Sequence, residues 1–114
     1  MEKDKAEQIA QQIAEEILEE MGGDAEAICT GDCTTFAKKM IHRLHKEGIE
    51  AVIIDNLSYE MKDELNGYPV EQGDDDRVSH CYVSILDGWM YFDAFDTDGL
   101  YNESDLQYTW RCKN

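Results

Sequence analysis

The stretch that decides the fold runs from residue 78 to residue 95 and reads VSHCYVSILDGWMYFDAF. Two runs rich in aromatic and β-branched residues, 78–86 and 89–95, flank the dipeptide Asp87-Gly88. Asp-Gly between two such runs is a strong signal for a β-hairpin with a tight turn. The sequence therefore predicts two antiparallel strands joined at residues 87 and 88.

The turn determines which residues of the hairpin face each other. A two-residue turn pairs Leu86 with Trp89, so paired residue numbers sum to 175, and a four-residue loop keeps the same sum. Side chains alternate along a strand, so five of them share one face: His80, Tyr82, Trp89, Tyr91 and Asp93. Asp93 then lies diagonally across from His80, within reach of a hydrogen bond. A register slip of one residue would move Asp93 to the opposite face.

Two amphipathic helices precede the hairpin. Apolar residues recur at helical spacing from Ala6 to Met21, and Gly22-Gly23 ends this first helix. The second helix is expected to begin at Asp32 or Cys33 and to end at Gly48. Its apolar arc includes Cys33, so the thiol is expected to face the core, whereas His42 and His45 fall outside the arc and should lie on the surface. Residues 24–30 form a connector or an extra helical turn.

The rest of the chain completes a small sheet. Residues 49–55 are expected to form a buried strand, and the stretch after Gly99 an edge strand. Residues 56–77 are polar and acidic and include the only proline, so they predict a long loop that is a candidate substrate-facing flap. The predicted fold class is α+β, with two helices packed on a small antiparallel sheet. Residues 1–114 are expected to form a single domain.

Cys33 is the candidate nucleophile. It lies in the sequence GDCTTFA, residues 31–37, where a loop of small and polar residues leads into the second helix. The reactive species of a cysteine is the thiolate, which a helix N-terminus and a nearby imidazolium both stabilise. His80 would supply the imidazole as general base and then acid, and Asp93 would orient it. Asp32 is an unfavourable neighbour, because its charge would raise the pKa of the thiol unless its side chain caps the helix.

The four cysteines allow other interpretations. A cysteine on an apolar helical arc is more often a small core residue than a nucleophile. Cys29, Cys33, His80 and Cys81 could be assembled into a zinc site, but the adjacent His80 and Cys81 point to opposite faces of a strand. We therefore expect no metal and no cofactor. Reduced thiols are expected, with one disulfide involving Cys29 or Cys112 as an alternative.

Charge restricts the classes of partner. Ten Lys and Arg residues against 26 Asp and Glu give a net charge of −16. Such a surface repels phosphate backbones and anionic membranes, so neither direct nucleic-acid binding nor membrane binding is expected, and a role near nucleic acid would be that of a DNA mimic. The sequence has no apolar signal segment and no apolar run long enough to span a bilayer. A cytoplasmic protein is expected.

The residues that carry this chemistry resemble a known family. GDCTTFA at 31–37, GIEA at 48–51, SHCY at 79–82 and WMYFD at 89–93 are similar to the core of transglutaminase-like cysteine enzymes. That family places its nucleophile at a helix N-terminus, its histidine on a strand with an aromatic two residues later, and its aspartate on the next strand. Cys33, His80, Tyr82 and Asp93 match these positions. The resemblance implies a papain-like α+β fold, a minimal domain spanning residues 1–114, and acyl transfer through a thioester.

Two functions from different classes follow. The first is a thiol-dependent acyl-transfer enzyme, foremost a cysteine hydrolase of the peptidase or amidase type, with Cys33, His80 and Asp93 as its catalytic triad. Its substrate would be a peptide or protein amide. The alternative is a non-catalytic acidic binding protein on the same fold, in which Cys33 is a core residue. Thiol reactivity separates the two, because a core cysteine in a folded protein is inert.

Overall fold

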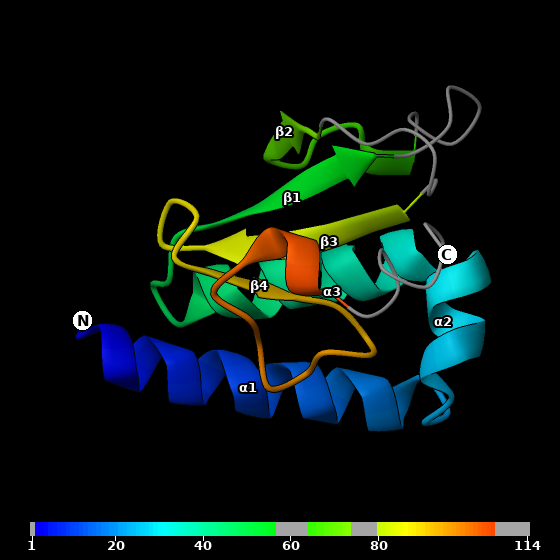
Figure 1. The fold of residues 1–114 in the computed structure, drawn as a ribbon, viewed down its shortest axis with the longest axis horizontal. Helices are drawn as coiled ribbons and strands as arrows, with labels where there is room; N and C mark the ends of the chain where they lie inside the picture. Colours follow the sequence, from blue (N-terminus) through cyan, green and yellow to red (C-terminus); the bar gives the residue numbers. More distant parts are fainter. Residues whose placement is uncertain (1, 57–63, 74–79, 107–114) are drawn as a thin grey trace.

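The computed structural model describes residues 2–56, 64–73 and 80–106 (Figure 1). Within these residues the chain is a small α+β domain with three α-helices and a four-stranded sheet. The elements follow in the order α1 (Lys3–Glu20), α2 (Ala25–Gly31), α3 (Cys33–Lys46), β1 (Ala51–Asn56), β2 (Val70–Gln72), β3 (His80–Ile85), β4 (Met90–Phe92) and the 3-10 helix η2 (Glu103–Asp105). The α+β class expected from the sequence is confirmed.

The helices number one more than the sequence predicts. The segment expected to be a connector or an extra turn forms α2, a helix of 7 residues. The Asp24 side chain caps it by accepting a hydrogen bond from the backbone N–H of Ala27 at 3.2 Å. The prediction of two helices was wrong because a helix this short shows less than two turns of periodicity.

The sheet is mixed, not antiparallel. Its strand order is β2-β1-β3-β4, in which β2 pairs parallel to β1 and the other neighbours are antiparallel. β2 lies inside the stretch predicted to be a long loop, so that prediction is wrong for residues 70–72. All three residues of β2 are exposed, and such a strand carries no apolar alternation that a sequence pattern could detect. The rest of the predicted loop is described only at 64–73, and the acidic run 74–76 lies outside the described residues.

The register of the hairpin is confirmed. Val83 pairs with Phe92, Ser84 with Tyr91 and Ile85 with Met90, so each pair sums to 175. The connecting turn spans residues 86–89, and its Leu86, Asp87 and Gly88 all have positive φ, at 51°, 57° and 85°. Asp and Gly tolerate this left-handed conformation better than most residues, which explains the turn signal at this dipeptide.

The hairpin strands are shorter than predicted. β4 ends at Phe92, and Trp89 lies in the turn, 38% exposed, where its Nε1 donates to Glu7 Oε1 of α1 at 2.9 Å. Trp89 is therefore not on the predicted shared face. The face itself is confirmed for Tyr82 and Tyr91, whose ring centroids are 6.2 Å apart. The expected C-terminal edge strand is reduced, among the described residues, to a single bridge between Tyr91 and Leu100.

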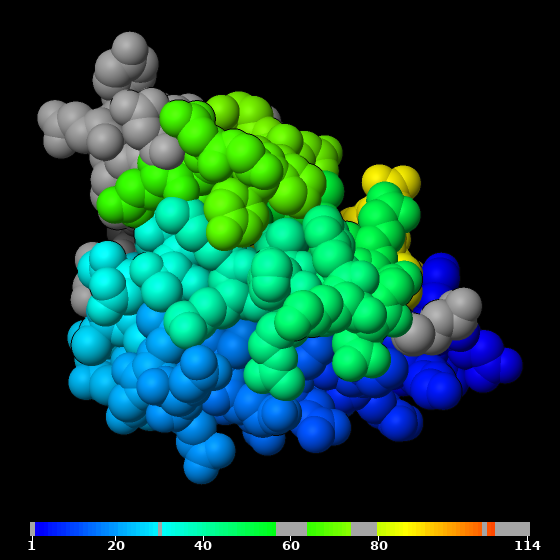
Figure 2. Space-filling model, turned by 180° about the vertical axis from the view of Figure 1, so that it is seen from behind, coloured from blue at the N-terminus to red at the C-terminus, as the bar shows by residue number. Residues whose placement is uncertain are grey.

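The three helices cover one face of the sheet. α3 packs against β1 and β3, and α1 and α2 pack against α3 (Figure 1). Seen from behind, α3 runs between α1 and the segment that contains β2 (Figure 2). A smaller apolar cluster of Ile54, Tyr82 and Leu106 forms on the other face, where η2 crosses the sheet. This arrangement places the N-terminus of α3 at the end of the sheet where β3 begins.

Candidate active site

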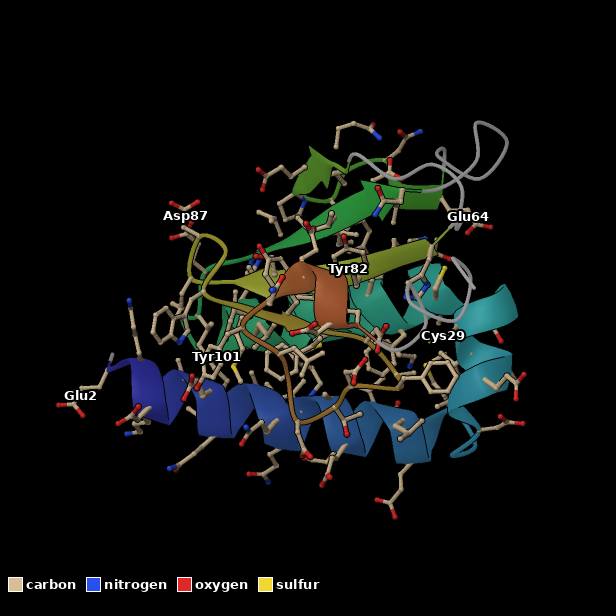
Figure 3. All side chains as sticks on the ribbon, viewed as in Figure 1. Glu2, Cys29, Glu64, Tyr82, Asp87 and Tyr101 are labelled. Carbon is tan, nitrogen blue, oxygen red and sulfur yellow. The ribbon has the colours of Figure 1, made fainter. Side chains whose placement is uncertain are left out.

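Three elements bring the predicted triad to one end of the domain. Cys33 is the first residue of α3, His80 is the first residue of β3, and Asp93 directly follows β4. β1 ends at the same place, since its last residue, Asn56, pairs with His80. Cys29 of α2 and Glu64 also lie at this end of the sheet (Figure 3). The structure therefore brings Cys33 and Asp93 to one end of the sheet although they are 60 positions apart in the sequence.

His80 and Asp93 form a buried hydrogen-bonded pair. His80 Nε2 lies 3.1 Å from Asp93 Oδ2, and the two residues are 0% and 1% exposed. The other carboxylate oxygen, Oδ1, accepts the backbone N–H groups of Phe95 at 3.0 Å and Asp96 at 2.8 Å. The chain turns sharply after β4, so both oxygens of Asp93 have fixed partners. The predicted contact between His80 and Asp93 is confirmed.

Cys33 lies in an environment that favours its thiolate. A hydrogen bond with the Cys81 side chain lowers its pKa, burial opposes this, and the hydrogen bond and charge of His80 lower it further, to about 5. Cys33 is also the first helical residue of α3, where the positive end of the helix favours an anion. The carboxylate of Asp32 makes no capping hydrogen bond to α3, and the residue is exposed.

The hydrogen-bond partners of His80 favour its protonated form. Burial lowers its pKa, but hydrogen bonds with Asp93 and Cys33 and their charges outweigh burial, so the pKa is raised above its ordinary value. The ring of Tyr82 lies 5.9 Å from the imidazole, centroid to centroid. The Tyr82 hydroxyl donates to Glu103 Oε2 at 2.6 Å and accepts from Asn56 Nδ2 at 3.2 Å, which fixes the ring beside the histidine.

Two further cysteines belong to this site, beside the three residues that the sequence predicts as catalytic. Cys81 is 1% exposed, and its pKa is raised first by its hydrogen bond with Cys33 and then by burial. Cys29 is 2% exposed, and burial followed by the nearby Asp93 carboxylate raises its pKa. Both are free thiols, so the alternative of a disulfide at Cys29 is wrong. Cys112 lies outside the described residues.

The site also contains a group with the chemistry of a metal centre. One ligand atom each from Cys29, His80 and Asp93 lies within 4.8 Å of the other two, and all three residues are buried. This set differs from the zinc site considered from the sequence, because Asp93 takes part. Sulfur, nitrogen and oxygen donors in one place suit a zinc ion better than magnesium or calcium, which prefer oxygen alone.

Part of the predicted flap contacts the start of α3. Thr34, the residue after the candidate nucleophile, donates from Oγ1 to Glu64 Oε2 at 2.6 Å. Leu65 beside it is buried in the main core. The described part of the segment is therefore attached to the element that carries Cys33.

The comparisons with known proteins add no relative. No family model, no curated protein and no solved structure matches the chain. Among the described residues, no helix has both the length and the apolar character needed to cross a bilayer.

Proposed function

We propose that this protein is a thiol-dependent acyl-transfer enzyme of the cysteine hydrolase type with a transglutaminase-like core. The observation that carries the proposal is the pairing of His80 Nε2 with Asp93 Oδ2 at 3.1 Å, beside a thiol at the N-terminus of a helix. A nucleophile, a base and a group that orients the base are the parts that thiol catalysis requires. Cys33 begins a helix, His80 begins a strand, and Asp93 directly follows the next strand, which supports the resemblance to transglutaminase-like enzymes.

The reaction starts from a thiolate at Cys33 and a protonated imidazole at His80. Asp93 holds Nε2 of His80, so Nδ1 is the ring nitrogen that carries the proton given up by Cys33. The thiolate attacks the carbonyl carbon of an amide, and its electron pair forms the carbon–sulfur bond. The carbonyl oxygen gains negative charge, which the backbone N–H of Cys33 can stabilise as one oxyanion donor. His80 then returns the proton to the leaving amine, and a thioester of Cys33 remains.

Water completes the cycle. His80, now neutral, takes a proton from water, and the resulting hydroxide equivalent attacks the thioester carbon. The carbon–sulfur bond breaks, the acid is released, and Cys33 returns to its thiolate form. Asp93 keeps the imidazole in one tautomer throughout and stabilises its charged form. The Cys81 thiol, which is hydrogen-bonded to Cys33, favours the thiolate at the start and the end of the cycle.

The proposed substrate is the amide bond of a peptide or protein, and the reaction uses only groups of this chain. Free buried thiols at residues 29, 33 and 81 support a reducing compartment such as the cytoplasm. The net charge of −16 supports a partner that is neither a nucleic acid nor an anionic membrane.

One observation favours the second candidate function, a non-catalytic acidic binding protein. Cys33 is 4% exposed and belongs to the main apolar core together with Phe36 and Met40 of the same helix. A thiol in that position can serve packing alone. On this account, the His80–Asp93 pair would be a structural hydrogen bond inside the core.

Replacement of the nucleophile separates the two functions. Cys33→Ser alters a single atom, and a buried hydroxyl without a partner costs ~1–3 kcal/mol, so the fold should survive. Turnover on a panel of amide and ester substrates should be lost, since serine beside an imidazole is a weaker nucleophile than a preformed thiolate. Melting temperatures are measured in parallel, with Cys112→Ser as the matched control. Equal turnover by Cys33→Ser and the control would show that Cys33 serves packing only.

A further inference from the structure

The proposed catalytic triad uses one cysteine, Cys33. The structure places a second thiol, that of Cys29, close to His80 and Asp93, the other two residues of the triad. Cys29 is buried, and one of its neighbours in the site is the Asp93 carboxylate. The ligand atoms of Cys29, His80 and Asp93 all lie within 4.8 Å of one another. The acyl-transfer mechanism uses His80 and Asp93 but assigns nothing to Cys29.

We propose that Cys29, His80 and Asp93 form a binding site for one zinc ion. The binding does not depend on the proposed function. The site is made of one sulfur, one nitrogen and one oxygen donor, each of a type that zinc accepts.

The distances are close to those of a tetrahedral centre. Nitrogen and oxygen ligands about 2.0–2.2 Å from zinc lie about 3.3–3.5 Å apart at the tetrahedral angle. His80 Nε2 and Asp93 Oδ2 are 3.1 Å apart, which is already near that value. The Cys29 sulfur must approach to about 3.6 Å, and no pair in the group exceeds 4.8 Å.

The surroundings provide the support that a metal centre needs. Asp93 Oδ1 accepts two backbone N–H groups, at 3.0 and 2.8 Å, so the carboxylate is held in place while Oδ2 faces His80. Such secondary hydrogen bonds orient metal ligands in known centres. The net charge of −16 also raises the local concentration of cations.

The binding step balances with the release of protons. Zinc replaces the hydrogen on the Cys29 sulfur and the hydrogen shared by His80 Nε2 and Asp93 Oδ2, and these protons pass to solvent. No oxidation or reduction takes place. Zinc then takes the place of the hydrogen bond between His80 Nε2 and Asp93 Oδ2, and both atoms become metal ligands.

The binding test uses the metal-free, reduced full chain. Zinc is titrated against a chromogenic chelator with the wild type, Cys29→Ser and the control Cys112→Ser. We expect one zinc ion per chain for the wild type and the control. Cys29→Ser should bind at least about tenfold more weakly, since even the loss of a residue that only orients a ligand costs about 10–100-fold. Equal affinity of Cys29→Ser and the wild type, or no zinc bound by the wild type, would overturn the site.

Cobalt provides a second measurement, which remains decisive even if Cys29→Ser does not fold. Cobalt(II) bound to a thiolate has a sulfur-to-cobalt charge-transfer band in the near ultraviolet. Cys33→Ser should keep this band, because Cys29 supplies the sulfur. Loss of the band in Cys33→Ser would show that another thiol is the ligand and would overturn the assignment.

Discussion

Asp93 is the residue on which the geometry of the site depends most. Its Oδ1 is occupied by the N–H groups of Phe95 and Asp96, and its Oδ2 faces His80 Nε2. A carboxylate with both oxygens engaged cannot rotate freely, so it fixes the plane of the imidazole. The hydrogen bond and the charge of Asp93 both favour the protonated imidazole of His80.

The variant Asp93→Asn should separate the role of Asp93 in orienting the His80 ring from its role in packing. The amide keeps the shape of the carboxylate and can still accept the two backbone N–H groups. Its NH₂ group would face His80 Nε2, however, and would stabilise the wrong tautomer. We expect turnover to fall on the order of 10³–10⁴-fold. The free energy of unfolding should fall by about 1.5–3 kcal/mol, because one hydrogen bond to a charged group is lost.

The control for this variant is Asp98→Asn, which changes an exposed aspartate five residues further along. Steady-state turnover and thermal unfolding are measured for both variants. The triad assignment would be wrong if Asp93→Asn and Asp98→Asn had the same turnover.

Cys81→Ala should raise the pKa of Cys33. The variant removes the largest influence that lowers this pKa, the hydrogen bond between the two thiols. A hydrogen bond to a charged group contributes about 1.5–3 kcal/mol, which corresponds to about 1–2 pH units. The pH dependence of Cys33 alkylation measures the shift in metal-free protein, with Cys112→Ala as the control. An unchanged midpoint would show that Cys81 is only a packing neighbour.

At the scale of single residues, the sequence predicted that Cys33, His80 and Asp93 come together, but it did not predict the residues around them. Cys33, His80 and Asp93 could be predicted because helical period, strand alternation and turn length constrain each of them. The side chains of adjacent residues such as His80 and Cys81 alternate along a strand, so the sequence predicted that they point to opposite faces of the sheet. Cys81 nevertheless forms a hydrogen bond with Cys33. Cys29 reaches Asp93 through the packing of α2, which depends on tertiary contacts that no local pattern encodes.

The hairpin is the element that positions the site, and a close backbone approach supports it. After β4 the chain returns along the sheet, and Leu100 forms a bridge with Tyr91. Gly99 has a φ of +81°, and a Cβ at this position would lie 2.6 Å from Phe92 Cζ and 2.9 Å from Met90 Cε. Only glycine therefore fits between the returning chain and β4.

Gly99→Ala should destabilise the hairpin by more than the strain of a positive φ at a residue other than glycine. Gly23 is the matched control, since its φ is +78° and nothing lies within 4 Å of an added Cβ. Gly23→Ala carries only the cost of the left-handed conformation, about 1–2 kcal/mol. Gly99→Ala adds overpacking against Phe92, about 1–3 kcal/mol more. Urea unfolding measures both variants, and equal free energies of unfolding would contradict the close contact.

At the scale of elements, the parts with a strong local signal were predicted and the weak ones were not. The register of β3 and β4 followed from the turn, since a two-residue and a four-residue connection give the same pairing. β2 was missed because its three residues are exposed and pair in parallel with β1 across a long connection. Trp89 was misplaced because its hydrogen bond with Glu7 is a contact between distant parts of the chain.

For the whole molecule, the dominant feature is charge. The chain has 26 acidic and 10 basic residues, and α3 contains four of the basic ones and no acidic residue. α1 packs beside it, with Glu16 3.0 Å from Arg43 and Glu20 3.2 Å from Lys39. These exposed pairs offset little of the net charge of −16, so the folded state carries a large self-repulsion.

Added salt should stabilise the fold. Between 0.01 M and 0.15 M NaCl the Debye length falls from 30 Å to about 8 Å, which screens most of the repulsion. We expect the melting temperature to rise by about 4 °C or more, the shift that ~1 kcal/mol gives a domain of this size. A variant with the exposed Glu15 and Glu19 changed to Gln should show a smaller rise. A melting temperature that falls with salt would contradict this account.

His80 and Asp93 are expected to sustain a thiolate at Cys33, and the pH dependence of Cys33 alkylation measures that thiolate. Iodoacetamide labelling is followed by peptide mass spectrometry in wild type and His80→Ala, with a chelator present and a small-molecule thiol as reference. Because the pKa of Cys33 is lowered to about 5, the wild-type rate should stay constant from pH 8 to pH 6 and fall only near pH 5. His80→Ala should move the midpoint upward by at least about one pH unit. A wild-type midpoint near the ordinary value of ~8.5, unchanged by His80→Ala, would contradict the account.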